Sequence, residues 1–289
     1  MKFNAIVAVA LMGAVAPAIA AIAPGSSGNG ELFLVVQNQD ARKSYTLDLG
    51  IRMDTFLGGV AGPAAGGLGQ TQGFAQSWSV MDDPIFTDFM AGTAMTDVVR
   101  WAVLAIDSTG NNNANQQRLL TTTFSNPLLS ADEVEQQMRG WTNGNFSLGI
   151  GGSQGGRFFD SVNTTGTHGT PGLPLDFDAN GSSLNFETDS GFAYFGKAGG
   201  LTPTFNTTAP FRSTNDIGVD SFFYYVTRSS TSQIGTVTTE RFANPFGPTV
   251  WNFDGTTLTV AAAVPEPGTY AMLGLGLLAV AAAARRRAR

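Results

Sequence analysis

The chain has 289 residues, with 16 Lys and Arg against 22 Asp and Glu, one histidine, no cysteine and 36 glycines. The two termini contain Lys2, Glu266 and four arginines; without them, 11 basic and 21 acidic residues leave a net charge of −10, and such an acidic surface argues against nucleic acid as a partner. The lack of cysteine excludes thiol nucleophiles and zinc–thiolate sites, and the single His168 excludes a histidine-rich metal centre.

The N-terminus has the pattern of a secretory signal. Met1-Lys2 is a short basic start, and an apolar run over residues 5–15 follows it. Ala18-Ile19-Ala20 is a small-x-small cleavage motif. We predict a signal peptide over residues 1–20, removed by signal peptidase after Ala20. Cleavage after Ala23 is disfavoured because Pro24 would follow the cut, and the apolar run is too short to span a bilayer.

Residues 21–263 are predicted to form an exported, β-rich domain. Alternating apolar positions separated by Gly, Asn and Ser turns are typical of short antiparallel strands. The predicted strands do not alternate with helices, as they would in a parallel sheet built from βαβ units. We therefore expect a mainly β fold, an antiparallel β-sandwich or jelly-roll-like domain. The predicted strands are Glu31–Val36, Ser44–Leu49, Phe74–Val80, Val98–Asp107, Arg118–Phe124, Phe146–Ile150, Ser221–Arg228, Val237–Phe242, Thr249–Phe253 and Thr256–Ala263.

One or two short helices interrupt these strands. Asp83-Pro84 is a helix start, and Ser130 with Glu133 forms a capping box before an apolar pair. Residues 58–73 contain seven glycines, and they are expected to form a mobile loop within the same domain, with a boundary between two domains as the alternative.

The most specific internal motif matches a calcium loop. Its spacing places Asp176, Asp178 and Asn180 at the first, third and fifth positions, with Gly181 at the turn and Glu187 at the twelfth. Prolines precede it where a helix should enter, so a β-hairpin that turns at Asn180-Gly181 is the favoured interpretation. Calcium is therefore only an alternative, and we otherwise expect no cofactor.

Two further binding or catalytic hypotheses remain open. Trp78, Trp101, Trp141 and Trp251 would stack on sugars if exposed, which would make the domain a carbohydrate-binding module. Several acidic residues flank aromatic ones, and two of them would supply the carboxylate pair of a secreted glycan hydrolase if they lay about 5–9 Å apart; they are Asp82, Asp83, Glu240 and Asp254. His168 lies in a Gly/Pro-rich loop that is unsuited to a catalytic triad. We expect no catalytic residues.

The C-terminus has the pattern of a short membrane anchor. Val264 is followed by Pro265-Glu266-Pro267, and residues 268–284 are then an Ala/Leu/Gly-rich run of about 25 Å as a helix, the lower limit for a transmembrane helix. The run ends in Arg285, Arg286, Arg287 and Arg289, which would stop transfer and hold the tail in the cytoplasm.

This terminus, over residues 264–289, resembles the PEP-CTERM sorting signal of Gram-negative bacteria. The resemblance implies export, transient anchoring in the membrane, and recognition of Pro265, Glu266 and Pro267 by exosortase, a membrane cysteine protease. We therefore expect a non-enzymatic protein of the cell surface or extracellular matrix, structural or adhesive in exopolysaccharide or biofilm, with extracellular polysaccharide as a possible partner.

Overall fold

The computed structural model describes residues 22–23, 25–59, 62–64, 66–110, 113–122, 131–150, 158–159, 161–165, 181–197 and 214–264. The elements within these ranges are η1 Gly25–Ser27, β1 Glu31–Asn38, β2 Lys43–Arg52, α1 Met53–Leu57, η2 Leu68–Gln70, β3 Ala75–Ser79, α2 Pro84–Met90, β4 Val99–Asp107, β5 Arg118–Thr122, α3 Ala131–Arg139, α4 Asn143–Ile150, β6 Ser182–Phe186, η3 Phe195–Lys197, β7 Asn215–Asp216, β8 Ser221–Thr227, β9 Thr238–Arg241, β10 Ala243–Asn244, β11 Gly247–Pro248, β12 Val250–Phe253 and β13 Thr257–Ala261.

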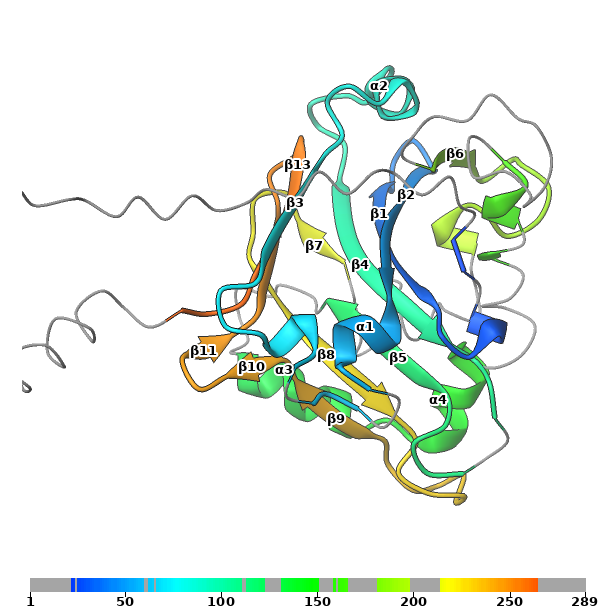
Figure 1. Cartoon of the computed structure of the whole chain (residues 1–289). Coiled ribbons are helices and arrows are strands. Elements are labelled where there is room, and N and C mark those ends of the chain that lie inside the picture. The colour runs from blue at the N-terminus through cyan, green and yellow to red at the C-terminus, as the bar shows by residue number, and fades with distance from the viewer. Residues whose placement is uncertain are drawn as a thin grey trace, which may run out of the picture.

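The fold is mainly β and its strand pairs are antiparallel, as predicted. Eleven of the described strands form one sheet, whose main path is β3-β13-β12-β8-β5-β4-β1-β2-β6. Strand β8 is one branch point, because Ser221 and Phe222 pair with β12 while residues 224–227 pair with β9, and β4 is another, because β7 pairs with it. The β12-β13-β3 arm lies on one side of the body and the β4-β1-β2 arm on the other (Figure 1).

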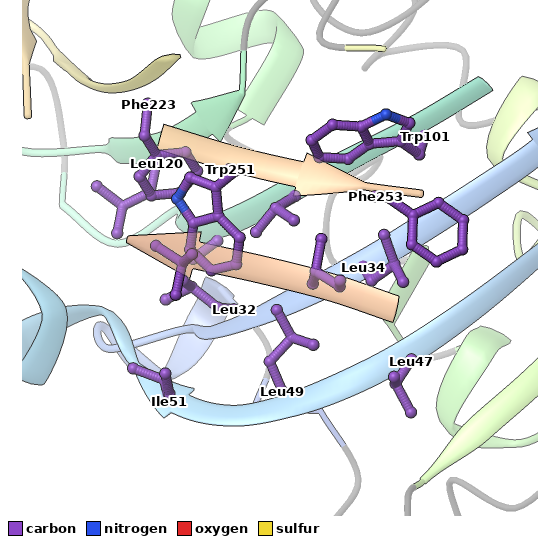
Figure 2. Close-up of a cluster of buried hydrophobic side chains, with 14 of the residues drawn as sticks. Leu32, Leu34, Leu47, Leu49, Ile51, Trp101, Leu120, Phe223, Trp251 and Phe253 are labelled. Atoms are coloured by element: carbon purple, nitrogen blue, oxygen red, sulfur yellow. The ribbon is translucent and has the colours of Figure 1, made fainter. Parts of the chain in front are cut away.

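The main hydrophobic core lies between these two arms. Trp251 and Phe253 of β12 face Leu34 of β1 and the leucines of β2 (Figure 2). The eight residues of β1 are all buried, because its other face is covered too. A strand buried on both faces is a continuous apolar run, and this explains why the sequence over β1 alternates only weakly.

Helices cover the face of the sheet that points away from the main core, which we call the outer face. Phe33 and Val35 of β1 belong to a second buried cluster on this face, the outer cluster. Phe146 and Ile150 of α4 join this cluster. The prediction of a strand over Phe146–Ile150 was therefore wrong. These two buried residues are four positions apart, and that spacing places them on one face of a helix, against the sheet.

The two predicted helix starts are confirmed. Asp83 caps α2 by accepting a 2.8 Å hydrogen bond from the amide of Ile85, and Pro84 occupies the first turn, where its missing N–H costs nothing. Helix α3 begins at Ala131, within the predicted capping box, whose Ser130 lies outside the described residues. Helix α1 was not predicted, although Gly58 ends it in the left-handed conformation with φ 82°.

The described part of the glycine-rich segment packs against the main core. Gly69, in η2, is buried beside the rings of Phe56 and Phe242, and its carbonyl accepts a hydrogen bond from Thr249 Oγ1. Strands β2 and β3 on either side of the segment belong to the same sheet. The glycine here provides the space that two aromatic rings occupy.

A buried arginine links three distant segments of the body. Arg118 on β5 donates from Nε to Asp107 Oδ2 at 2.8 Å, from Nη1 to Asp54 Oδ1 at 2.8 Å and from Nη2 to the Gly28 carbonyl at 2.7 Å. Burial lowers the pKa of Arg118, but the two carboxylates outweigh burial and raise it. The charge is compensated within the body, as a buried ion pair requires.

Candidate functional site

The folded body ends immediately before the predicted sorting tail. The amide of Ala262 donates a 2.8 Å hydrogen bond to the carbonyl of Phe74, and Asn244 Nδ2 donates to the carbonyl of Ala263 at 2.7 Å. Val264 is 56 % exposed and is the last described residue. The chain is thus held in the body until two residues before the predicted Pro-Glu-Pro box.

All of the predicted processing residues lie outside the described part of the chain. These are Ala18, Ala20, Pro265, Glu266, Pro267, Arg285, Arg286, Arg287 and Arg289. Within the described residues, no helix is long and apolar enough to cross a membrane. The predicted span over residues 268–284 lies outside the described residues.

The segment after the predicted signal peptide is integrated into the body. Ile22 is fully buried in the outer cluster, its N–H donates to Asn163 Oδ1 and its carbonyl accepts from Asn163 Nδ2, both at 3.0 Å. The N–H of Ala23 donates to Glu31 Oε2 at 2.8 Å. A mature chain that begins at residue 21 would retain all these contacts.

An acidic pair lies beside this N-terminal segment. Glu31 is buried, and its Oε1 is 3.1 Å from Arg52 Nε. Burial, followed by the charge of Glu31, raises the pKa of Asp48 to about 7, although the Gly50 amide and Arg52 act in the opposite direction. A carboxyl group with this pKa exchanges its proton near neutral pH, so Asp48 is the strongest acid–base candidate among the described residues.

Sequence reasoning missed this pair because the two acids are 17 positions apart. Strands β1 and β2 bring them together: Glu31 is paired with Arg52 and Phe33 with Asp48, with an irregularity in register between Glu31 and Phe33. A short sequence motif does not show how two strands are aligned with each other. The available signal was a carboxylate at the start of one predicted strand, Glu31–Val36, and another within the next, Ser44–Leu49.

The predicted calcium loop is only partly described. Asp176, Asp178 and Asn180 lie outside the described residues. Glu187 is described, and its Oε2 is 2.6 Å from Arg42 Nη1. No group of three or more His, Cys, Asp or Glu side chains that could hold a metal occurs in the part of the chain that the structure describes.

The four tryptophans are not exposed. Trp101 and Trp251 are fully buried, while Trp78 and Trp141 are half-buried. Trp78 stacks on Trp251 with ring centroids 5.8 Å apart, and its Nε1 donates to the carbonyl of Leu49 at 3.2 Å. Trp101, Trp251 and Trp78 contribute to the main core, and Trp141 packs against the outer cluster with its ring centroid 6.0 Å from that of Phe146.

The acidic residues that the sequence placed near aromatic rings have separate roles. Asp83 is buried, where it caps α2 and accepts a 2.6 Å hydrogen bond from Tyr45 Oη. Asp254 accepts from the Thr256 amide in the β12–β13 turn, and this contact lowers its pKa. Burial raises the pKa of Glu240 on β9. Asp82 is exposed.

The comparison with protein families finds one match, to the profile described as the PEP-CTERM protein-sorting motif, over residues 263–287. The chain carries a PEP-CTERM sorting motif. The motif implies export, membrane-anchored sorting and processing by exosortase, and it begins at Ala263, where the last contacts with the body are made. Residues 1–262 match no family profile, and neither a curated protein nor a solved structure matches the chain.

Proposed function

We propose that this chain is a non-enzymatic protein of the cell surface or extracellular matrix, structural or adhesive in exopolysaccharide or biofilm. The observation that carries the proposal is the PEP-CTERM motif at residues 263–287. In this proposal signal peptidase removes residues 1–20, residues 268–284 anchor the chain transiently as a helix, and exosortase recognises Pro265, Glu266 and Pro267.

Two features of the body support a structural role. The buried charged groups serve the fold: Arg118 joins three segments, Asp83 caps a helix and Glu31 holds the N-terminal segment. The body also carries a net charge of −10, which keeps copies apart in a crowded matrix through mutual repulsion.

The proposal is tested in cells with and without exosortase. With exosortase, the recovered protein should lack the tail and fractionate outside the cell, together with exopolysaccharide. Without it, the protein should keep its full tail mass and remain with the membrane. A chain that ends at Val264 is the matched control, because it needs no exosortase and should be released from both strains. Unchanged mass and location in the mutant would refute the proposal.

A secreted glycan hydrolase is the second candidate, and one observation favours it: the raised pKa of Asp48, close to that of a general acid. Against it, the Glu31 carboxylate is already bound to the Ala23 amide and Arg52. Hydrolysis of the producer's own polysaccharide that is lost in Asp48→Asn but retained in Asp97→Asn would establish the hydrolase and exclude the structural role.

A further inference from the structure

The tail leaves the body through a surface made by three segments, which we call the exit face: residues 71–77, 243–249 and 259–264. Strand β13 pairs with β3 from Thr257 to Ala261. The β10–β11 hairpin is joined to the end of the body through the bond from Asn244 Nδ2 to the Ala263 carbonyl. A Cβ at Gly73 would be 3.6 Å from Val264 Cγ1, so the loop before β3 borders the same point.

The exit face carries no ionisable side chain of Asp, Glu, Lys, Arg or His. The surrounding body is strongly acidic, with a net charge of −10. The charged residue Asp254 is in the turn before β13, at the opposite end of that strand from the exit. Arg241, which precedes the hairpin, lies over the ring of Phe222 and is 3.7 Å from Asp132.

Two apolar side chains project from this uncharged surface. Phe246, in the turn of the β10–β11 hairpin, is 46 % exposed, and Val264 is 56 % exposed. Thr71, Ala75 and Ser77 are also exposed. Phe is one of the side chains that interfacial proteins insert at the boundary between the headgroups and the acyl chains.

The length of the tail determines what this face meets. Gly268, the first residue of the apolar run, is only six residue steps along the chain from Ala262, whose amide is bonded to the carbonyl of Phe74. Even fully extended, these steps reach about 20 Å. The headgroup layer is roughly 5–7 Å thick on each side of the hydrocarbon. An anchored chain therefore holds the exit face close to the lipid headgroups.

We propose that the exit face rests on the headgroup layer of the bilayer while the tail is anchored, with Phe246 inserted in the interfacial zone; this inference rests on the proposed anchoring of residues 268–284. An uncharged face avoids the repulsion that the acidic body would meet at anionic headgroups. One Phe and one Val hold a protein on lipid only weakly. The body therefore leaves the membrane once exosortase removes the tail.

The test uses the full mature chain, residues 21–289, in vesicles of phosphatidylethanolamine and phosphatidylglycerol. The natural chain has no cysteine, so Phe246→Cys and Ala261→Cys place single nitroxide labels on the exit face. Met95→Cys is the control, because Met95 is an exposed apolar residue in the segment after α2. Figure 1 shows α2 and the β10–β11 hairpin at opposite ends of β3.

We expect the ratio of collisions with oxygen to collisions with a water-soluble nickel chelate to be several-fold higher at positions 246 and 261 than at position 95. Equal ratios at all three positions would overturn the proposal. Shielding of position 246 that occurs only after exosortase is added would also overturn it, and would identify the enzyme as the partner of this face.

A second variant controls for changes in folding. Phe246→Asp should make the label at position 261 several-fold more accessible to the nickel chelate, while Met95→Asp should not, with unchanged near-ultraviolet circular dichroism in both. An unchanged label at 261 in Phe246→Asp would contradict the proposal. Flotation at alkaline pH tests the anchor separately: a chain that floats while its labels stay aqueous refutes only the exit-face contact, and a chain that does not float refutes the anchoring.

Discussion

The side-chain amide of Asn163 and the backbone of Ile22 form two reciprocal hydrogen bonds, both of 3.0 Å, between residues 141 positions apart. The side-chain amide of Asn163 thus bonds to both backbone polar groups of Ile22, as the backbone of a neighbouring strand would. Ile22 is fully buried beside these bonds. The first residues after the predicted signal peptide are therefore part of the fold.

This arrangement favours processing after Ala20, and we expect the mature protein to begin at Ala21 when its mass is measured. Ile22→Ala should lower the free energy of unfolding by about 2–5 kcal/mol, because it leaves a cavity in the outer cluster. Ser26→Ala, at an exposed position of η1, is the control and should change little. A mature chain that begins at Pro24 would contradict the prediction.

Arg118 and Arg42 allow a buried ion pair to be compared with an exposed one. Arg118→Leu leaves the buried Asp107 without its partner, and urea unfolding should show a loss of about 3–5 kcal/mol. Arg42 pairs with Glu187 at the surface, where the arginine side chain is 68 % exposed. Arg42→Leu should cost less than about 1 kcal/mol. Similar losses in the two variants would show that Arg118 does not hold the body together.

The pKa of Asp48 predicts how stability depends on pH. In the folded chain, burial and Glu31 raise this pKa to about 7, whereas in the unfolded chain it is about 4. Between these values the folded state binds more protons, so the free energy of unfolding should fall as pH rises from about 4 to about 7. Asp48→Asn should remove this fall and be more stable than the natural chain at pH 8.

Asp97 provides the control of opposite sign. The Asn38 amide, followed by the Ala94 N–H, lowers its pKa. Asp97 therefore stabilises the fold above about pH 4, and this contribution is lost as pH falls below that value. Asp97→Asn should lower stability above about pH 4 and remove the acid-side loss, and it should leave the slope between pH 4 and 7 unchanged, as measured by thermal unfolding. If Asp48→Asn keeps the slope between pH 4 and 7, Asp48 is not its source.

Gly69 and Gly59 test whether the glycine-rich segment is packed. A Cβ at Gly69 would lie 2.3 Å from Cε1 of Phe56 and 2.7 Å from Cδ1 of Phe242. Gly69→Ala should therefore cost about 1–3 kcal/mol through overpacking of a buried site. A Cβ at Gly59 would meet nothing within 4 Å, and Gly59→Ala should be neutral or slightly stabilising. Equal effects would show that η2 does not pack on the aromatic core in solution.

Calcium remains a prediction from the loop motif. Because Glu187 already pairs with Arg42, we expect a chelator and millimolar calcium to give the same midpoint of thermal unfolding. A higher midpoint with calcium, abolished by Asp176→Asn, would establish the metal site. Asp189→Asn is the control, because Asp189 lies outside the motif.

Local patterns in the sequence were sufficient for the sorting motif, the antiparallel strands and the starts of α2 and α3. Each of these depends on residues within a few positions of one another, such as Asp83 and Ile85 in the cap of α2. The sorting motif is likewise a continuous segment, residues 263–287. Such patterns act before any long-range contact forms, and they are therefore visible in the chain itself.

Only the tertiary structure decided the rest. Phe146 and Ile150 fit a strand or a helix by pattern, and packing on the outer face of the sheet selected the helix. The pKa of Asp48 depends on Glu31, which the register of β1 and β2 brings near. The uncharged exit face joins segments more than 160 positions apart. Burial, charge pairing and surface composition each depend on which residues are neighbours in space. The order of residues along the chain does not by itself show which residues those are.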